Sequence, residues 1–168
     1  MEYNSETVWN DHTPDLIKEI IAFWTTENAL PPDEIPLNRA KETVIVTRDS
    51  DGRIVGTSTV QARIVPRLAQ PMYYYRMYSN AEHRGQRTGY AMLEKTQTVL
   101  GEFTKAQATP AALGIILEVE NKTYSGRYPQ AVWPMNFNFI GYSPRSLPLY
   151  AYYFPDAKLL PPARRRAI

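Results

Sequence analysis

The stretch Tyr73–Phe103 constrains the fold more than any other part of the chain, because it combines a strand, a turn and a helix in direct succession. Aromatic and apolar residues up to Ser79 are typical of a strand. The turn His83–Gly89 is short, basic and contains two glycines. Spacings of three and four positions, typical of a helix, follow at Met92, Leu93, Thr96, Val99, Leu100 and Phe103.

This strand–turn–helix stretch predicts a binding site for an anionic group. The first N–H groups of a helix have no partner within the helix, and the helix dipole places partial positive charge at that end. Gly85 and Gly89 allow a ligand to approach the backbone closely. Arg84 and Arg87 add two full positive charges. The turn alone leaves open the alternative of a surface turn that caps an amphipathic helix.

The same residues resemble a known signature. The pattern Arg84-x-x-Arg87-x-Gly89-x-Ala91 resembles the R/Q-x-x-G-x-G/A signature of the GNAT superfamily of acyl-CoA-dependent N-acyltransferases. The resemblance implies that the pyrophosphate of acetyl-CoA, or of another acyl-CoA, is held by Arg84, Gly85, Gln86, Arg87, Thr88 and Gly89. It implies that the pantetheine arm is bound by the backbone of Met77, Tyr78 and Ser79.

One position departs from the signature, because its middle glycine is Arg87 here. A residue other than glycine is strained at positive φ. We therefore expect the backbone of Arg87 in an ordinary region, with its side chain lying over phosphate.

Length and composition indicate a soluble, cytoplasmic protein with one domain over residues 1–156 and a Pro- and Arg-rich tail over residues 157–168. No apolar run approaches the ~20 residues of a membrane-spanning helix. The N-terminus lacks the features of a signal peptide. The absence of Cys excludes disulfides and thiolate metal sites, and the two His residues offer no metal-binding spacing.

The net charge of +2 gives little reason to expect nucleic-acid binding. Three of the positive charges belong to Arg164, Arg165 and Arg166, so the rest of the chain carries a net charge of −1. This arginine run is interpreted as a solvated tail, and the alternative is a contact with phosphate or with a partner.

The predicted elements follow the order of a GNAT domain. We expect an α+β fold with a central mixed, mostly antiparallel sheet, a splayed parallel strand pair and flanking helices. A helix capped by Thr13 comes first, and the nature of the segment Asp33–Lys41 is left open. Between residues 121 and 132, Gly126 and Pro129 limit any helix to short pieces. The predicted strands are Thr43–Thr47, Arg53–Val65, Met72–Ser79, Leu113–Glu120, Asn136–Tyr142 and Leu147–Phe154.

Acyl transfer to an amine requires a base for the ammonium and an acid for the departing thiolate. By resemblance, the base is a carboxylate on the central strand or on its parallel neighbour, and the central strand Met72–Ser79 has none. We assign Glu118 rather than Glu120 on the neighbouring strand, because Glu118 lies further inside it and a desolvated carboxylate there would have a raised pKa. The alternative is a solvated or Arg-paired carboxylate. By resemblance, Asn121 binds the pantetheine amides, and Tyr128, seven residues later, is the acid, with Tyr124 as a fallback.

The sequence therefore predicts a GNAT-like N-acetyltransferase that acts by direct attack of a bound amine, since the chain has no Cys nucleophile. The acceptor is a small-molecule or peptide amine, without membrane partners, and a homodimer is left open. A rival prediction is a non-catalytic acyl-CoA-binding or regulatory domain on the same fold. A nucleic-acid-binding module, resting on the arginine tail, is a third.

Overall fold

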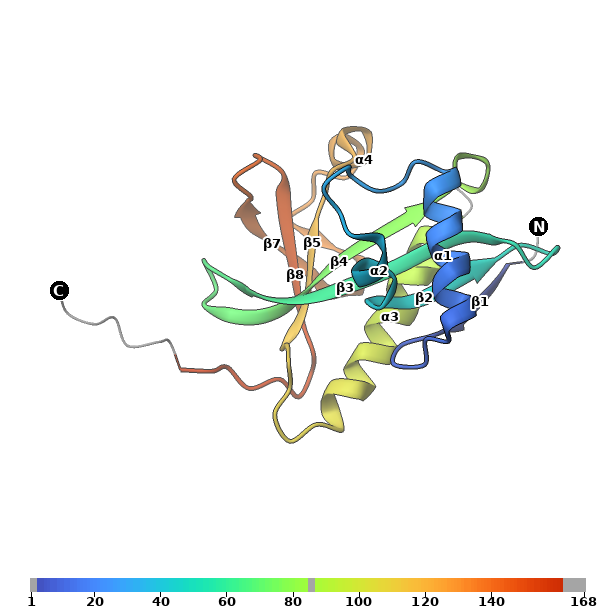
Figure 1. The fold of residues 1–168 in the computed structure, drawn as a ribbon. Coiled ribbons are helices and arrows are strands. Elements are labelled where there is room, and N and C mark those ends of the chain that lie inside the picture. Colours follow the sequence, from blue (N-terminus) through green and yellow to red (C-terminus); the bar gives the residue numbers. More distant parts are fainter. Residues whose placement is uncertain (1–2, 85–86, 162–168) are drawn as a thin grey trace. The chain divides into compact units, whose positions relative to one another are not determined.

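The computed structural model describes residues 3–84 and 87–161, without the side chains of residues 122–124 (Figure 1). The described chain forms two compact units. The first comprises the residues up to Val60 together with Arg76–Leu100, and the second comprises Gln61–Tyr75 and the residues from Gly101 onward. The strands β3 (Ile54–Val65) and β4 (Gln70–Ser79) contribute residues to both units.

Within the described residues, eight strands form a mixed sheet in the order β1-β2-β3-β4-β5-β8-β7-β6. β4 and β5 pair in parallel, with Tyr74 opposite Ile116, whereas β1–β2, β2–β3, β5–β8, β6–β7 and β7–β8 are antiparallel. The parallel pair confirms the predicted strand–helix–strand crossover. The other strands are β1 (Asn4–Thr7), β2 (Thr43–Arg48), β5 (Gly114–Glu118), β6 (Val132–Trp133), β7 (Phe137–Tyr142) and β8 (Pro148–Tyr153).

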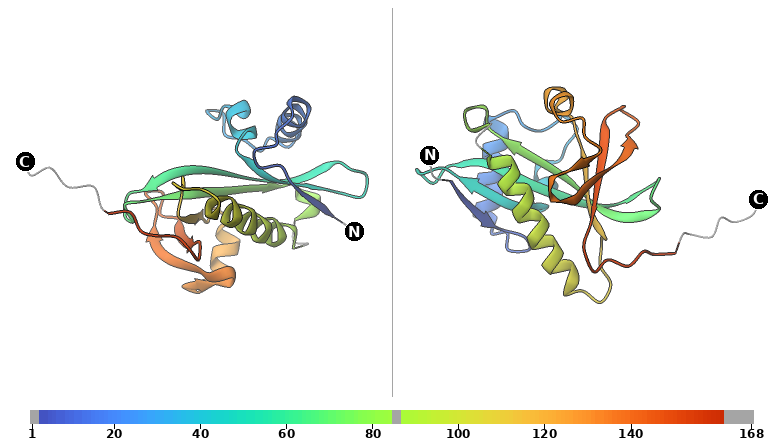
Figure 2. Two further views of the ribbon diagram at one scale, coloured as in Figure 1. Left: turned by 90° about the horizontal axis from the view of Figure 1, so that it is seen from below. Right: turned by 180° about the vertical axis from the view of Figure 1, so that it is seen from behind.

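Four α-helices occur in the described chain: α1 (Pro14–Thr26), α2 (Pro36–Ala40), α3 (Thr88–Lys105) and α4 (Lys122–Arg127). In the first unit, α1 and α2 lie on one face of the strands, and α3 lies on the other (Figure 2). Two short 3₁₀ helices cover Ala81–His83 and Pro134–Asn136.

Helix α1 begins and packs as the sequence predicts. The Thr13 hydroxyl accepts a hydrogen bond from the Leu16 N–H at 3.2 Å, which satisfies a backbone donor that has no partner in the helix. Ile20 and Trp24 are buried against the strands. The Trp24 indole N–H also donates to the Thr57 hydroxyl at 3.0 Å, so its polar atom is satisfied in the core.

Strand β1 was not predicted from the sequence. Its four residues are polar and partly exposed, so they carry no apolar alternation. The strand forms because its backbone pairs with β2, and because the Ser5 and Thr47 hydroxyls hydrogen-bond at 2.8 Å. The two-residue β6 also lacks a sequence signal.

In the second unit, β5 is buried along most of its length and pairs with β8. A Cβ atom at Gly114 would lie 1.9 Å from the Tyr152 carbonyl oxygen, so this position requires glycine. The predicted hairpin of β7 and β8 is confirmed, with Phe139 opposite Tyr150. Gly141 adopts a φ of 118°, beside a register shift in β7.

Candidate functional site

The first group of predicted site residues lies in the first unit, where β4 ends and α3 begins. β4 ends at Ser79 and α3 begins at Thr88. Gly85 and Gln86, which we expected in the phosphate turn, lie outside the described residues. The expected site is therefore represented here by Arg84, Arg87 and the first turn of α3.

The expectation of an ordinary backbone conformation for Arg87 is wrong. Arg87 has a φ of 62°, in the left-handed region. Its carbonyl oxygen accepts a hydrogen bond from the Ala91 N–H at 3.0 Å, so Arg87 immediately precedes the first helical residue. The chain must turn sharply there to enter the helix, and this requirement outweighs a strain of about 1 kcal/mol. Arg87 thus has the kind of backbone that favours the glycine of the signature.

The first turn of α3 packs closely against β4. A Cβ atom on Gly89 would lie 2.6 Å from the terminal methyl carbon of Met77. The glycine therefore allows the exposed Met77 side chain to lie over the start of the helix. Behind this turn, the Thr88 hydroxyl donates to the His83 carbonyl at 3.3 Å, and the buried His83 ring hydrogen-bonds the Tyr3 hydroxyl at 2.9 Å.

The side chain of Arg84 contacts the end of β4. Its Nε donates to the Ser79 carbonyl oxygen at 3.0 Å, and its guanidinium carbon lies 5.6 Å from the centroid of the Tyr78 ring. Arg84 therefore stabilises the end of β4, the segment that we expect, by resemblance, to contact pantetheine. Its charge stays at the turn, on an exposed side chain.

Two polar atoms at the end of β4 fit a bound ligand. Ser79 Oγ and Asn80 Oδ1 are buried and have no hydrogen-bond partner in the part of the chain that the structure describes. Buried polar groups are normally paired, so such atoms call for an explanation. An amide N–H, such as those of a pantetheine arm, could donate to either atom, whereas a phosphate oxygen could pair only with the Ser79 hydroxyl, as its acceptor. The left-handed turn at Arg87 and the helix start add backbone donors suited to an anion.

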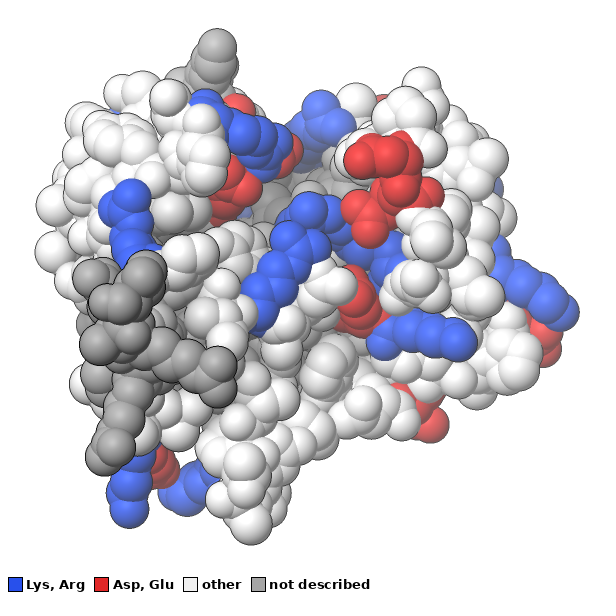
Figure 3. Space-filling model, turned by 60° about the vertical axis from the view of Figure 1, so that its left-hand side comes forward, with Lys and Arg blue, Asp and Glu red and all other residues white. Residues whose placement is uncertain are grey.

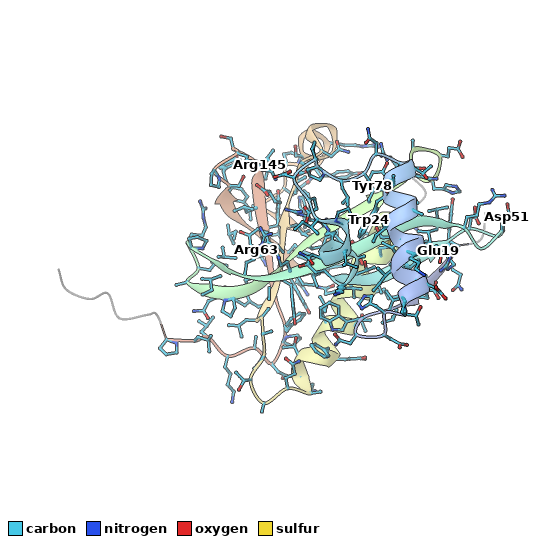
Figure 4. All side chains as sticks on the ribbon, viewed as in Figure 1. Glu19, Trp24, Asp51, Arg63, Tyr78 and Arg145 are labelled. Atoms are coloured by element: carbon cyan, nitrogen blue, oxygen red, sulfur yellow. The ribbon has the colours of Figure 1, made fainter. Side chains whose placement is uncertain are left out.

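Tyr78 connects β4 to α1. Its hydroxyl donates toward the Glu27 carbonyl oxygen at 3.2 Å and lies 3.3 Å from the Glu27 carboxylate. Its ring packs edge-on against Phe23, and Figure 4 shows Tyr78 beside α1. Burial and the nearby Glu27 carboxylate raise the pKa of the Tyr78 phenol, so it stays protonated near neutral pH.

An ion-pair cluster in the first unit was missed in the sequence. Arg76 of β4 contacts Glu34 at 3.0 Å, and the same carboxylate lies 3.4 Å from the buried Arg39. The Arg39 Nε donates to the Thr59 hydroxyl at 2.7 Å. The sequence does contain a signal, since Arg76 is the single charged residue in the aromatic stretch Met72–Ser79.

The second group of predicted residues lies in the second unit. Glu118, at the end of β5, is ion-paired with Arg145 at 2.7 Å, and Glu120 contacts the same guanidinium at 2.6 Å. Arg145 lies in the turn between β7 and β8 (Figure 4). The two carboxylates raise the pKa of the Arg145 guanidinium further. The ion pair agrees with the alternative that Glu118 is a carboxylate paired with an arginine.

Asn121 and Tyr128 flank the short helix α4. The Asn121 carbonyl accepts a hydrogen bond from the Ser125 N–H at 2.9 Å, so Asn121 immediately precedes the helix. Tyr128 follows its last residue, and 39% of Tyr128 is exposed. The Tyr128 carbonyl accepts a hydrogen bond from the Trp133 indole at 3.0 Å. The six-residue α4 confirms the expectation of a short helical piece.

The described residues contain no helix long and apolar enough to cross a lipid bilayer. They also contain no group of three or more His, Cys, Asp or Glu side chains that could hold a metal ion. On the face shown in Figure 3, Lys and Arg side chains lie among Asp and Glu side chains. As far as the described surface on that face extends, the two signs are therefore mixed.

No protein-family model matches the sequence, and no curated protein sequence matches it. Several solved structures, however, match the structure of this chain. The ribosomal-protein-S5-alanine acetyltransferase of Vibrio fischeri matches with a TM-score of 0.60 and 12% identity, over 95% of this chain and 97% of that chain. A GNAT-family acetyltransferase of Staphylococcus aureus MU50 matches with a TM-score of 0.57 and 18% identity, over 91% and 99%.

A chain of the NatC complex, solved with bound Gag peptide and CoA, matches with a TM-score of 0.57 and 14% identity, over 90% of this chain and 96% of that chain. At these identities the likeness concerns the fold. The chain has the fold of the GNAT acetyltransferases, which confirms the resemblance at that level.

Proposed function

We propose that this protein is an acyl-CoA-dependent N-acyltransferase that transfers an acetyl group from acetyl-CoA directly to a primary amine. The observation that carries the proposal is the start of α3, where Arg87 has a left-handed backbone that favours glycine, at the position where the GNAT signature has its middle glycine. The fold of the acetyltransferases supports it.

The start of α3 and the end of β4 would hold the co-substrate. The backbone from Arg87 to Gly89, with the charges of Arg84 and Arg87, would bind the pyrophosphate. The backbone of Met77 to Ser79 would bind the pantetheine arm, with Asn121 as a further partner. Bound acetyl-CoA supplies an activated thioester.

The protein's own residues would then move two protons. Glu118 would accept a proton from the acceptor ammonium, directly or through water, and the freed amine would attack the thioester carbonyl. A C–N bond forms and the C–S bond breaks. Tyr128 would donate a proton to the departing thiolate, and the second proton that the nitrogen loses as the amide forms would return to Tyr128 through water. No acyl-enzyme is required, in keeping with the absence of Cys.

A second candidate function is a non-catalytic acyl-CoA-binding or regulatory domain. The observation that favours it is the ion pair of Glu118 with Arg145. A neighbouring cation stabilises the ionised carboxylate and makes it a weaker base. In this alternative, Glu118 and Glu120 hold the β7–β8 turn and take no part in proton transfer.

Two measurements separate these functions. Acetyl-CoA should raise the Tm, because a ligand that binds the folded state stabilises it. The release of free CoA thiol should then be followed with amines, amino acids and peptides as acceptors. A Tm increase with amine-dependent thiol release supports the acyltransferase. A Tm increase without release supports the binding domain, and no shift at about millimolar acetyl-CoA contradicts both.

A further inference from the structure

The ion-pair cluster of Arg76, Glu34 and Arg39 contacts β4 next to the segment proposed to bind pantetheine. Arg76 immediately precedes Met77–Ser79, the segment proposed to bind pantetheine. Its side chain contacts Glu34, which precedes α2. Successive side chains of a strand point to opposite faces. Arg76 and Tyr78 therefore share the face that carries α1 and α2, while Met77 faces the start of α3.

The proposed cofactor site leaves the other face of this strand for the acceptor. The proposed phosphate site belongs to the start of α3, on the Met77 side. On the other side, the segment between α1 and α2 is tied to β4 at two points, by Glu27 to Tyr78 and by Glu34 to Arg76. An amine that approaches the thioester from this side passes Arg76.

The carboxylate of Glu34 is shared within the cluster. One carboxylate, Glu34, lies within ion-pair distance of two guanidinium groups. In the described chain, Glu34 supplies the one ion pair of Arg76, and the Arg76 side chain is 45% exposed. A guanidinium carries five N–H donors in a planar fork that matches a carboxylate. Arg76 can therefore bind a second carboxylate without losing the first.

Arg39 is the buried and fixed member of the cluster. Its side chain is 10% exposed and is held by the Thr59 hydroxyl at 2.7 Å. Glu34 therefore keeps a buried cationic partner when an incoming anion contacts Arg76. Breaking a buried charge pair is costly, so Glu34 stays with Arg39 while the incoming carboxylate binds the exposed part of the Arg76 guanidinium.

We propose that Arg76 selects acceptors that carry a carboxylate near the reacting amine, as in free amino acids. This inference rests on the proposed acetyl transfer and specifies its substrate class. Arg76 acts by binding and orienting the acceptor through a charge-assisted, bidentate contact. Amines without a carboxylate would lack this contact.

The test compares phenylalanine and leucine with phenylalaninamide and leucinamide. The selectivity is the ratio of kcat/KM for an amino acid to kcat/KM for its amide. It should fall about 10- to 100-fold in Arg76→Gln, the range expected for a hydrogen bond to a charged group. Dividing the wild-type ratio by the variant ratio removes the intrinsic reactivity of the amines. In Glu34→Gln the selectivity should rise, because the negative charge that repels an incoming carboxylate is gone.

Arg53→Gln is the matched control. It removes the same charge from an exposed arginine, whose partner is Asp51 in the β2–β3 turn. It should leave the selectivity unchanged. Tm and acetyl-CoA binding report whether Arg76→Gln remains folded, and a variant that loses both would be replaced by Arg76→Lys, which keeps the charge but not the bidentate fork.

Calorimetry with the same ligands, at saturating CoA, separates this inference from the proposed function. Tighter binding of the amino acids than of the amides, lost in Arg76→Gln, supports the inference even when no acceptor is acetylated. In that case the proposed transfer fails alone. Equal binding and turnover of acids and amides in the wild-type protein, or a selectivity that survives Arg76→Gln, overturns the inference and leaves the transfer intact. No binding of either ligand overturns it as well.

Discussion

At the scale of single residues, Arg87 shows what a motif does and does not predict. The spacing of Arg84, Gly89 and Ala91 indicates the signature. The arginine at its middle position, however, led to a wrong prediction of the backbone conformation there. The turn that enters α3 imposes this conformation. The conformational preference of arginine alone does not include the demand of that turn, so it predicts an ordinary φ. The arginine therefore combines a strained backbone with an added charge.

This combination predicts different effects for two substitutions of Arg87. Arg87→Ala removes the charge and keeps the strain, because alanine is as disfavoured as arginine at this φ. Arg87→Gly removes both. We expect Arg87→Gly to be about 1 kcal/mol more stable than Arg87→Ala toward unfolding in urea. Both should bind acetyl-CoA more weakly than the wild-type protein, by about 10-fold or more for Arg87→Ala.

Thermal shift or calorimetry with acetyl-CoA measures the second effect. If Arg87→Gly binds more tightly than Arg87→Ala, the backbone conformation contributes to the site along with the charge. Identical stability of the two variants would argue against the strained backbone. Unchanged acetyl-CoA affinity in both would remove Arg87 from the phosphate site.

At the scale of elements, the signals that worked were local ones. The start of α1 was predicted because Thr13 and Pro14 are favoured at the cap and at the first helical position, and the structure contains the corresponding hydrogen bond. β1 was missed because its stability comes from pairing with β2, a contact between segments about forty residues apart in the chain.

The cap of α1 should have a measurable effect on stability. Thr13→Ala removes the acceptor of the Leu16 N–H and should lower the free energy of unfolding by about 1 kcal/mol. Thr13→Ser keeps the hydroxyl and should lie close to the wild-type value. Urea unfolding followed by circular dichroism compares the three proteins. An alanine variant as stable as the serine variant would show that the cap contributes nothing.

The ion pairs of Arg48 predict a pH dependence. Arg48 joins β1 and α1 to β2 through Glu6 and Glu19. The hydrogen bond and the charge of Arg48 lower the pKa of Glu19 below its usual 4.5. A lowered pKa stabilises the folded protein above the unfolded-state value, and this contribution is lost as the pH falls through the folded-state value.

The change from Glu19 to glutamine should therefore cost stability at pH 7, and this cost should shrink as the pH falls below about 4.5. The difference should stay below about 1 kcal/mol, because the Glu19 side chain is 44% exposed and solvent screens the pair. Urea midpoints at pH 7, 5, 4 and 3 measure it. Asp15→Asn, which alters an ion pair whose carboxylate is 94% exposed, is the control. A constant difference at all four pH values would contradict the assignment.

At the scale of the whole molecule, the sequence predicted the order of most elements and the parallel pairing of β4 with β5. Apolar periodicity carries that information, because each buried face leaves a pattern along the chain. The partners of individual charges are different. The contacts of Glu118 with Arg145 and of Arg76 with Glu34 join residues 27 and 42 positions apart. No local pattern indicates which charges meet.

The ion pair with Arg145 leaves two possible roles for Glu118: proton transfer in an enzyme, or support of the β7–β8 turn in a binding domain. Glu118→Gln keeps the shape of the side chain and removes its basicity, and Tyr128→Phe keeps the ring and removes the hydroxyl. For an acetyltransferase we expect each to lower kcat by about 10²- to 10⁴-fold with acetyl-CoA affinity nearly unchanged. The Glu118→Gln defect should shrink as the pH rises, because more of the acceptor is already the free amine.

Arg145→Gln distinguishes the two roles of Glu118. If Glu118 is the base, releasing it from the guanidinium makes the carboxylate a stronger base and should preserve or raise turnover near neutral pH. If the ion pair serves only to hold the β7–β8 turn, Arg145→Gln and Glu118→Gln should lower the Tm by similar amounts. Neither variant should then change the turnover of the wild-type protein. Full activity in Glu118→Gln and Tyr128→Phe would reject both assignments and leave the proposed transfer standing. Tight acetyl-CoA binding without acylation of any acceptor, in the wild-type protein, would establish the binding domain instead.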